Sequence, residues 1–346
     1  MHIGLLGTGG WARVHLEALA ASPHVSKVTL VGRNDQARTE LARKYPIVGA
    51  TLQDHRQLLA DPSVELVHVV LPHHLHAPRV TDALAAGKHV ICEKPAATNL
   101  TEFDAMVTTA AKHQLRFLVV MNHLYNPVVW RVRELLDQGA IGRPFLSTEN
   151  SYSSATKFYR DASNWRNSLD RAGGGILIDG GYHMVYRHLF ILAGHGSPQS
   201  AIAHTAQLGV SEDGSLVETK GEDFVSITIE YATSLRISWG HAWTLAANIE
   251  RCRQSFIAGT QGTLEFTDDT QNPILLHSPQ KPTPVDVDSG PQSGAETAHD
   301  CLLDYLDCVA TDREPERAST DFARTTLATI LAAYESGRSG RRIPVS

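Results

Sequence analysis

Residues 2–12, which read His-Ile-Gly-Leu-Leu-Gly-Thr-Gly-Gly-Trp-Ala, decide the fold of this chain. A short apolar run leads from His2 into the loop Gly7-Thr8-Gly9-Gly10-Trp11-Ala12. In a G-x-G-x-x-A loop, the first glycine permits a tight turn, the second lets the backbone approach a pyrophosphate, and the alanine allows close helix–strand packing. The free N–H groups at the start of the helix favour phosphate. This stretch therefore predicts a strand, a turn and a helix that bind a dinucleotide.

Strands and helices alternate in this way up to about residue 122. Strands are expected at Lys27–Val31, Leu66–Leu71, His89–Cys92 and Arg116–Met121, and helices reach to about Ser22 and Tyr45 and cover about Ala77–Ala86 and Leu100–Lys112. The last helix has a start signal, because Glu102 follows Asn99 by three residues. Strands that are apolar on both faces and joined by helices indicate a parallel sheet covered on both sides. We therefore predict a doubly wound α/β dinucleotide-binding domain over residues 1–122.

The pattern changes in the remainder, residues 123–346. Helices are expected at Pro127–Gln138, about Gly175–Leu192, Glu296–Ala310 and Thr320–Ser336, and strands near Arg143–Tyr152, Arg251–Ala258 and Thr263–Phe266. Apolar residues alternate with polar ones along Val225–Tyr231 and Leu235–Trp243, which is typical of half-buried strands. A one-sided antiparallel or mixed sheet needs a cover for its second face. We expect that cover to be another subunit.

Composition and charge narrow the class of protein. The 346 residues suffice for two domains, and 42% hydrophobic with 20% charged residues is an ordinary globular mixture. A net charge of -6 argues against a nucleic-acid or anionic-membrane partner. The chain enters a strand at once and has no apolar run of membrane-spanning length. Its four cysteines, Cys92, Cys252, Cys301 and Cys308, lack CxxC spacing, so we expect free thiols in a reducing cytoplasm.

A histidine cluster invites a metal-site interpretation that the spacing does not favour. His73, His74 and His76 follow the end of a predicted strand, and no partner Cys or Glu stands at zinc-ligand spacing. We therefore expect no metal site.

The end of the second strand bears on the choice of cofactor. An acid at this position would hold the ribose hydroxyls of NAD, but the chain reads Val31-Gly32-Arg33-Asn34. Arg33 can meet a 2′-phosphate with charge-assisted hydrogen bonds, and Asn34 can add a second contact. The sequence therefore favours NADP over NAD.

Two later segments carry candidate catalytic residues. Lys94 lies between Glu93 and Pro95 at the end of a predicted strand, which is the edge where open α/β sheets bind ligands. Asp179 and His183 are four residues apart, so they share one face of the predicted helix, and Gly173-Gly174-Gly175 lets the backbone come near a ligand before it. A histidine can take and return an alcohol proton near neutral pH, and a nearby carboxylate can orient the ring.

These motifs together resemble the glucose–fructose oxidoreductase/inositol dehydrogenase (Gfo/Idh/MocA) family. The resemblance rests on the glycine loop, the run Ala86-Gly-Lys-His-Val-Ile-Cys-Glu-Lys-Pro95, the triple glycine with Asp179 and His183, and Ala333-Tyr-Glu-Ser336. It runs in order along nearly the whole chain, and the AGKHV-x-x-EKP segment is its most specific part. It implies a Rossmann domain followed by an α/β domain with a large open, mostly antiparallel sheet that forms homodimers or homotetramers.

The resemblance also implies site residues. Lys94, Asp179 and His183 take the catalytic positions, and Glu93 would touch the nicotinamide ribose. Cofactor contacts are expected from Gly7, Thr8, Gly9, Gly10, Trp11, Ala12, Arg33, Asn34, Leu71, Pro72, His73, His76, Glu93, Lys94 and Asn122. Substrate contacts are expected from Lys94, His123, Tyr152, Trp165, Arg166, Asp179 and His183.

The chain departs from the family pattern at a few positions. Tyr186 replaces an acid three residues after the histidine, and Asn122-His123 follow the sixth strand where an arginine is common. Leu71 replaces a threonine, and His73 replaces an asparagine. These departures concern substrate identity and the nicotinamide-side contacts.

The activity implied is transfer of a hydride between NADP or NAD and a carbinol carbon of a sugar, sugar derivative or cyclitol. The sequence leaves open whether Lys94 or His183 touches the reacting oxygen. One alternative is an NADPH-dependent reductase of a keto-sugar or another carbonyl compound. Another is a non-catalytic dinucleotide-sensing regulator on the same fold. Retention of Lys94, Asp179 and His183 together favours an enzyme.

Overall fold

The protein forms two compact units. The computed structural model describes residues 1–153, 164–211, 214–244, 253–267, 273–279, 281–291 and 293–346. The first unit comprises Met1–Tyr125 and Ser293–Arg324, and the second Asn126–Gln292 and Thr325–Ser346. The division into domains 1–122 and 123–346 stays a prediction.

The first unit is built on a six-stranded parallel sheet. Its strands are β1 (His2–Leu6), β2 (Lys27–Val31), β3 (Val48–Leu52), β4 (Val64–Val69), β5 (His89–Cys92) and β6 (Phe117–Val119). Their order is β3-β2-β1-β4-β5-β6, and each neighbouring pair is parallel. This confirms the predicted doubly wound Rossmann sheet. Its strand order reverses between β1 and β4, where such sheets bind ligands.

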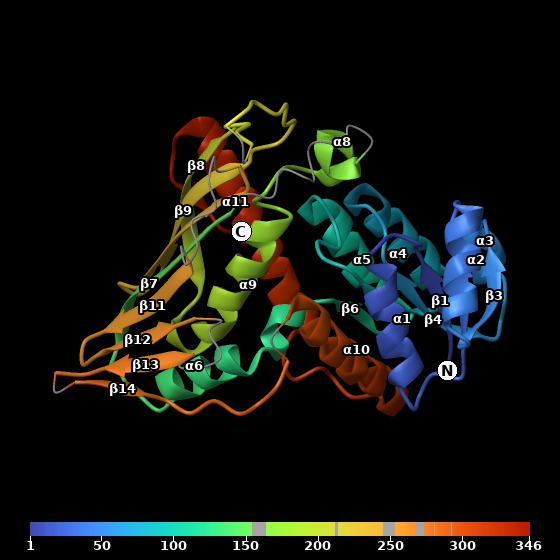
Figure 1. Ribbon diagram of the computed structural model, residues 1–346, viewed down its shortest axis with the longest axis horizontal. Helices are drawn as coiled ribbons and strands as arrows, with labels where there is room; N and C mark the ends of the chain where they lie inside the picture. Colours follow the sequence, from blue (N-terminus) through green and yellow to red (C-terminus); the bar gives the residue numbers. More distant parts are fainter. Residues whose placement is uncertain (154–163, 212–213, 245–252, 268–272, 280, 292) are drawn as a thin grey trace. The chain divides into compact units, whose positions relative to one another are not determined.

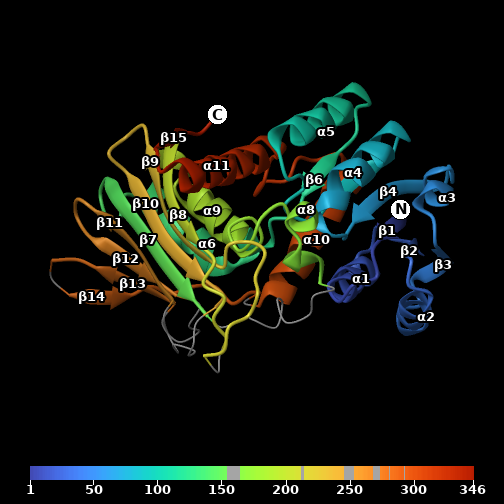
Figure 2. The same cartoon turned by 90° about the horizontal axis from the view of Figure 1, so that it is seen from above.

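Helices cover both faces of this sheet. They are α1 (Ala12–Ala21), α2 (Asp35–Lys44), α3 (His55–Leu59), α4 (His76–Ala85), α5 (Leu100–Lys112) and α10 (Gly294–Thr311), with short 3₁₀ turns η1 (His73–Leu75) and η2 (Asn122–Tyr125). Helix α1 packs on α10 and α4 packs on α5, on opposite faces of the sheet (Figure 2). The predicted start of α5 is confirmed, because the Asn99 side chain accepts a 2.9 Å hydrogen bond from the Glu102 N–H.

Sequence reasoning missed β3 and α3. Strand β3 is an edge strand in which only Val48 is buried, so it has no apolar run, and α3 is barely longer than one turn.

The second unit is built on a nine-stranded mixed sheet. Its strands are β7 (Pro144–Tyr152), β8 (Pro198–Ala206), β9 (Phe224–Tyr231), β10 (Arg236–Ala242), β11 (Arg253–Gly259), β12 (Thr263–Phe266), β13 (Ile274–His277), β14 (Pro282–Pro284) and β15 (Ile343–Pro344). Their order is β14-β13-β12-β11-β7-β10-β9-β8-β15. Among these described strands only β7 and β10 pair in parallel. The prediction of a large, mostly antiparallel sheet is confirmed.

Helices pack on one face of this second sheet (Figure 1). Helices α6 (Pro127–Asp137), α9 (Gly180–Ile191) and α11 (Thr320–Ser339), whose first residues belong to the first unit, lie on this face. The other helical elements of the unit are η3 (Trp165–Asn167), α8 (Leu169–Ala172) and η4 (Ala193–His195). Helix α9 lies so close to β10 that a Cβ on Gly181 would come within 2.9 Å of Trp239. In β9 the side chains of Val225, Ile227, Ile229 and Tyr231 face this side and are buried, whereas on the other face Ser226 is exposed and Phe224 and Thr228 are half-buried.

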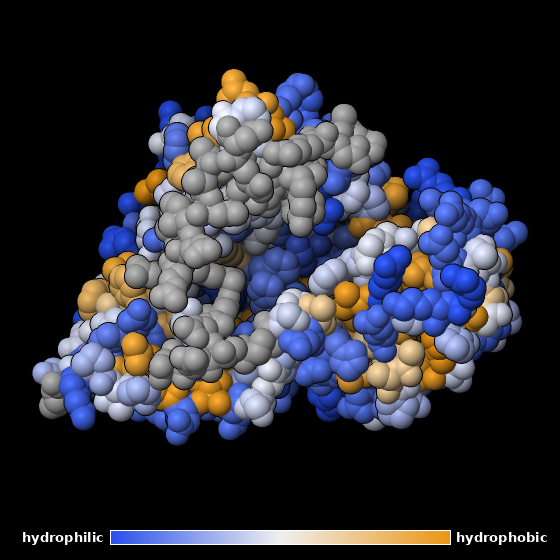
Figure 3. Space-filling view, in the orientation of Figure 1, coloured by the Kyte–Doolittle hydropathy of each residue, from blue (hydrophilic) through white to orange (hydrophobic). Residues whose placement is uncertain are grey.

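The surface of the first unit is mixed. On the face drawn in Figure 3, its hydrophobic residues are interspersed with hydrophilic ones. Within the described residues, no helix combines the length and apolar character that crossing a bilayer requires. Those residues also form no group of three or more His, Cys, Asp or Glu that could hold a metal ion.

Candidate active site

The glycine loop has the geometry of a dinucleotide cradle. Gly7 has a φ of +125°, and a Cβ there would overlap the Val70 carbonyl oxygen, so only glycine makes this turn. A Cβ on Gly9 or Gly10 would meet no atom within 4 Å, so this part of the loop faces open space. Ala12 is fully buried as the first residue of α1. The residues present therefore fit a pyrophosphate held by the loop and the helix N-terminus.

The residue after β2, where an acid would bind the ribose of NAD, is Gly32, and the space beside it is filled. A Cβ on Gly32 would come within 2.5 Å of the Thr8 Cγ2 atom, so the glycine loop occupies the space a side chain would need. Arg33 is exposed, and Asn34 caps α2 by accepting a 3.0 Å hydrogen bond from the Ala37 N–H. Sequence reasoning missed Arg38, which is buried and donates to the Gly32 carbonyl oxygen and to Asp35.

Glu93 links the end of β5 to the glycine loop. Its Oε1 accepts a 3.0 Å hydrogen bond from Trp11 Nε1, and its Oε2 accepts a 3.1 Å bond from the backbone N–H of Lys94. His15 Nε2 also lies 3.0 Å from Oε1. Burial raises the pKa of Glu93, but His15, Lys94 and Trp11 outweigh burial and hold the pKa below its ordinary value. The ionised carboxylate thus holds Lys94 beside the cofactor loop.

A second buried histidine supports this arrangement. His68 lies inside β4, and its Nε2 is 3.0 Å from Nδ1 of His15. Burial, and then the His15 charge, hold the pKa of His68 well below its ordinary value, so its ring is neutral. If His68 donates from Nε2, the proton of His15 faces Glu93 from the other ring nitrogen. The signal for this pair was present in the sequence, since a histidine interrupts the apolar run Leu66–Leu71.

The remaining expected cofactor residues of the first unit lie after β4 and β6. Leu71 and Pro72 are half-buried, and His73 is buried. His76 is fully buried and contacts the Leu71 and Pro95 carbonyl oxygens, so its ring holds backbone segments of the site. Asn122 donates from Nδ2 to the Gly294 carbonyl oxygen and to Thr297 Oγ1, each at 3.1 Å, and so joins η2 to α10.

In the second unit, Asp179 and Arg166 form an ion pair. Arg166 Nε donates to Asp179 Oδ2 at 2.6 Å, and the Arg166 guanidinium lies 4.4 Å from the centre of the Trp165 ring. The prediction that the following helix begins near Gly175 is wrong, because α9 begins at Gly180 and Asp179 is its N-cap residue. The glycines before it favour a loop, and Glu222 takes two of the backbone N–H groups of that loop.

His183 lies in the first turn of α9 and has a tyrosine partner. Its Nδ1 is 2.8 Å from the Tyr186 hydroxyl, which is fully buried. A hydroxyl can donate to the ring or accept from it, whereas a carboxylate can only accept. Tyr186 is therefore a functional candidate that sequence reasoning recorded only as a departure from a family pattern, although its spacing of three residues places it on the same helix face.

The triple glycine serves protein packing. A Cβ on Gly174 would overlap the Tyr334 hydroxyl, and a Cβ on Gly175 would overlap the Glu222 carbonyl oxygen. The Glu222 carboxylate accepts from the Gly175 N–H at 2.9 Å, the Leu177 N–H at 3.0 Å and the Tyr334 hydroxyl at 2.6 Å. The expected approach of a ligand is thus replaced by an approach of protein groups, which fix the loop before Asp179.

A buried ion-pair network holds α9 on the sheet. Glu149, fully buried on β7, accepts hydrogen bonds from Arg187 and, at 3.0 Å, from His188 Nε2. His188 Nδ1 lies 2.9 Å from Ser147 Oγ on the same strand. Burial raises the pKa of Glu149, but Arg187 and His188 outweigh burial and hold that pKa well below its ordinary value. Because α9 also carries His183, this network fixes the helix that presents the candidate base.

Two further residues expected to contact substrate, His123 and Tyr152, belong to different units. His123 is half-buried in η2 of the first unit. Tyr152 ends β7 in the second unit, and its hydroxyl donates to Asn150 Oδ1 at 3.2 Å. In the first unit the structure brings Trp11, Glu93 and Lys94 together. In the second unit it brings Trp165, Arg166 and Asp179 together at the start of α9.

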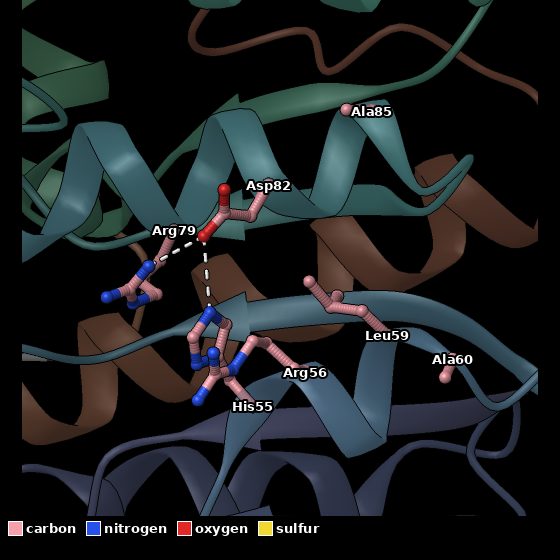
Figure 4. Close-up of a pocket in the computed structure, with 7 residues that line it drawn as sticks. All are labelled: His55, Arg56, Leu59, Ala60, Arg79, Asp82 and Ala85. Atoms are coloured by element: carbon pink, nitrogen blue, oxygen red, sulfur yellow. Dashed lines mark hydrogen bonds and ion pairs between the residues drawn. The ribbon is translucent and has the colours of Figure 1, made fainter.

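A separate pocket of about 730 Å³ lies between α3 and α4 (Figure 4). Asp82 Oδ2 accepts from Arg79 at 2.6 Å and lies 3.2 Å from His55 Nε2, so Asp82 pairs with two of the other lining residues. Arg56, which also lines the pocket, pairs with Asp54. None of the residues expected in the site lines this pocket.

Two family models match the chain. A model described as an oxidoreductase family with an NAD-binding Rossmann fold matches residues 1–121, and the GFO/IDH/MocA C-terminal domain model matches residues 129–265.

Several relatives are dehydrogenases. Levoglucosan dehydrogenase from Pseudarthrobacter phenanthrenivorans is 31% identical over 59% of this chain, and the match spans about half of that enzyme, 54% of its length. Trans-1,2-dihydrobenzene-1,2-diol dehydrogenase from Mus musculus is 28% identical over 72% of this chain and 69% of that enzyme. D-xylose 1-dehydrogenase (NADP+) from Haloarcula marismortui is 22% identical over 98% of this chain and 91% of that enzyme.

Solved structures share the fold. Levoglucosan dehydrogenase in complex with NADH and levoglucosan superimposes with a TM-score of 0.85 at 22% identity, covering 100% of this chain and 99% of that chain. An aldose-aldose oxidoreductase from Caulobacter crescentus gives a TM-score of 0.82 at 22% identity, covering 99% of each chain.

Proposed function

Because the chain belongs to the Gfo/Idh/MocA family of NAD(P)-dependent oxidoreductases, we propose that it oxidises or reduces one carbon of a sugar, sugar derivative or cyclitol. The observation that carries the proposal is the hydrogen bond from Trp11 to Glu93, which brings the strand end bearing Lys94 to the glycine loop. Sugar oxidoreductases among the relatives support the substrate class.

The catalytic residues in this proposal are Lys94, Asp179 and His183. A bound nicotinamide would supply the acceptor or donor of the hydride. In the oxidative direction the carbinol loses its hydroxyl proton to His183, and the Lys94 ammonium stabilises the negative charge that develops on oxygen. The carbinol becomes a carbonyl, and the proton leaves through His183 to solvent. Asp179, held by Arg166, orients a substrate hydroxyl or the His183 ring.

The test is a screen of sugars, sugar glycosides and cyclitols with NADP+ and NAD+, read by absorbance of the reduced nicotinamide. With a substrate in hand, Lys94→Ala and His183→Ala should each lower turnover by about 10²–10⁴, the usual cost of losing an acid–base group. Dinucleotide binding should persist in both variants. Exposed Lys112→Ala and His204→Ala are matched controls that should keep wild-type turnover.

Two results would contradict this assignment. Turnover within a few-fold of wild type in both catalytic variants would place the proton transfer elsewhere. Dinucleotide binding without turnover on any sugar, cyclitol or keto-sugar would favour a sensor on the same fold.

We also propose that the enzyme prefers NADP. The exposed Arg33 and the filled space at Gly32 support this preference. Arg33→Ala should weaken NADP binding by about 1–3 kcal/mol, as expected for hydrogen bonds to a charged group, and should leave NAD binding nearly unchanged. Arg43→Ala, an exposed arginine on α2, is the control. Tighter binding of NAD than NADP to the wild-type protein would refute the assignment.

We propose a homodimer or homotetramer assembled through the open face of the second sheet. Exposed or half-buried Ser226 and Thr228 lie on that face, opposite the buried side chains of β9. Thr228→Arg should therefore lower the mass measured by light scattering, and Thr101→Arg on α5 should not. If light scattering gives the mass of a monomer for the wild-type protein at micromolar concentration, the proposal is wrong.

We propose the reducing cytoplasm as the place of action. The described cysteines Cys92, Cys301 and Cys308 are free and buried, which supports a protein that does not depend on disulfides. A disulfide found by mass spectrometry in protein purified without reductant would contradict this.

A further inference from the structure

The fully buried ring of His76, at the start of α4, lies between two backbone carbonyl groups. Nδ1 is 2.7 Å from the Pro95 oxygen, and Nε2 is 2.6 Å from the Leu71 oxygen. These contacts join the segment that follows β4 to the segment that follows β5. The second of these segments carries Glu93 and Lys94, and Glu93 is bonded to the glycine loop.

The two contacts of His76 require more ring protons than a neutral histidine has. A carbonyl oxygen only accepts hydrogen bonds, and a neutral imidazole has a single N–H. With one proton, His76 would direct a ring lone pair at a carbonyl oxygen at hydrogen-bond distance. Both contacts are hydrogen bonds only when each ring nitrogen carries a proton.

We propose that His76 is a positioning residue whose doubly protonated ring ties the Leu71–His73 segment to Glu93–Lys94–Pro95 and thereby shapes the dinucleotide site. The inference rests on the proposed function for its consequence, although the bridge itself is a property of the first unit alone. Losing one ring proton opens one arm of the bridge and frees one segment of the site.

The charged and titratable groups that face His76 set the pH at which this occurs. Burial lowers the pKa of His76, the two carbonyl contacts and Glu93 oppose that effect, and Lys94 acts with burial. The His73 ring on η1 lies 5.9 Å away. Since the pKa lies below its ordinary value near 6.5, the bridge is complete in acid and loses an arm as the pH rises toward neutrality. Dinucleotide affinity should fall over the same interval.

The first experiment observes the ring directly. The wild-type protein is labelled with ¹⁵N-histidine, and long-range ¹H–¹⁵N spectra are recorded from pH 5 to 8.5, with the His76 signals assigned by their loss in His76→Gln. We expect a pattern with two protonated ring nitrogens at the acid end that converts to a single N–H. A ring with one proton throughout overturns the proposal. If His76→Gln does not fold, His76→Asn provides the assignment.

The second experiment measures binding of NAD+ by calorimetry over the same pH range, because NAD+ lacks the 2′-phosphate whose own ionisation lies near pH 6. Below the transition, His76→Phe removes both hydrogen bonds of the bridge and should bind NAD+ at least about tenfold more weakly than wild type, since the loss of even one charge-assisted hydrogen bond has about that effect. Wild-type affinity should fall with pH, and that of His76→Phe should not. The control is His113→Phe, an exposed histidine of the same unit.

The outcomes separate the bridge from the proposed function. A doubly protonated His76 combined with NAD+ affinity within twofold of wild type in His76→Phe would overturn the positioning role. Absence of any NAD+ or NADP+ binding to the wild-type protein would overturn the proposed function, while the spectra would still decide the protonation of His76.

Discussion

Replacing Glu149 should destabilise the second unit strongly, because its carboxylate is the counter-charge of a buried arginine. Glu149 is fully buried and the Arg187 side chain is 7% exposed, so water screens neither. Glu149→Leu leaves the guanidinium buried without that partner, and breaking a buried pair from one side costs about 3–5 kcal/mol. With a urea m-value of about 3 kcal/mol/M, the unfolding midpoint should fall by roughly 1–1.7 M. Arg187→Met should cost a similar amount.

The double variant distinguishes this cause from lost packing. In Glu149→Leu/Arg187→Met both charges are gone, and such replacements of buried pairs are often neutral or stabilising. The double variant should therefore unfold closer to the wild-type midpoint than either single variant, and it should fall short of wild type by the hydrogen bond that His188 Nε2 loses with Glu149, about 1–3 kcal/mol. The coupling energy between the two sites should be at least about 3 kcal/mol. Glu335→Leu breaks an exposed ion pair with Arg338 and should change stability by about 1 kcal/mol or less.

The dependence of stability on acid pH tests the same ion pair independently. The pKa of Glu149 is depressed in the folded protein. Its contribution to the free energy of unfolding is therefore fully present above the pKa of an unfolded glutamate, about 4.3, and is lost as the pH falls toward the pKa of the folded state. Between pH 5 and pH 3, wild type should lose more stability than the double variant. Additive effects of the two single changes, or a cost below about 1 kcal/mol for Glu149→Leu, would refute the reasoning. Tryptophan fluorescence and circular dichroism, with coincident transitions required, are suitable probes.

Three smaller predictions follow from single contacts. Tyr334→Phe removes the hydroxyl that lies between Glu222 and the Ile178 N–H, so urea unfolding should show a loss of about 1–3 kcal/mol, and an unchanged midpoint would contradict this. Gly32→Asp should not create NAD preference by itself because Thr8 fills the space, whereas Gly32→Asp with Thr8→Gly should raise NAD affinity in a binding titration; a full effect from the single change would count against the clash. Burial raises the pKa of the Cys308 thiol to about 11, so iodoacetamide at pH 8 should label it quickly only after unfolding, as followed by mass spectrometry.

Local sequence patterns were sufficient to predict the first sheet and the turn of the glycine loop. A parallel strand that is buried on both faces is a continuous apolar run in the sequence. The central residues of β2, β4, β5 and β6 could therefore be predicted. Strand β3 could not, because it is an edge strand with few buried residues. The roles of Gly7 and Ala12 were also predictable, because the turn and the packing at these positions depend only on neighbouring residues and on the strand beside them.

Tertiary structure decided which side chains are partners. Glu93 meets Trp11 and His15, and Glu222 meets the glycine loop before α9, across separations in sequence that no local pattern encodes. Tertiary structure also decided where α9 begins. Glu222 binds backbone N–H groups of the preceding loop, and the helix begins only at Gly180. Periodicity reports which face of an element is buried. It does not report what lies against that face, because that depends on how distant segments pack together.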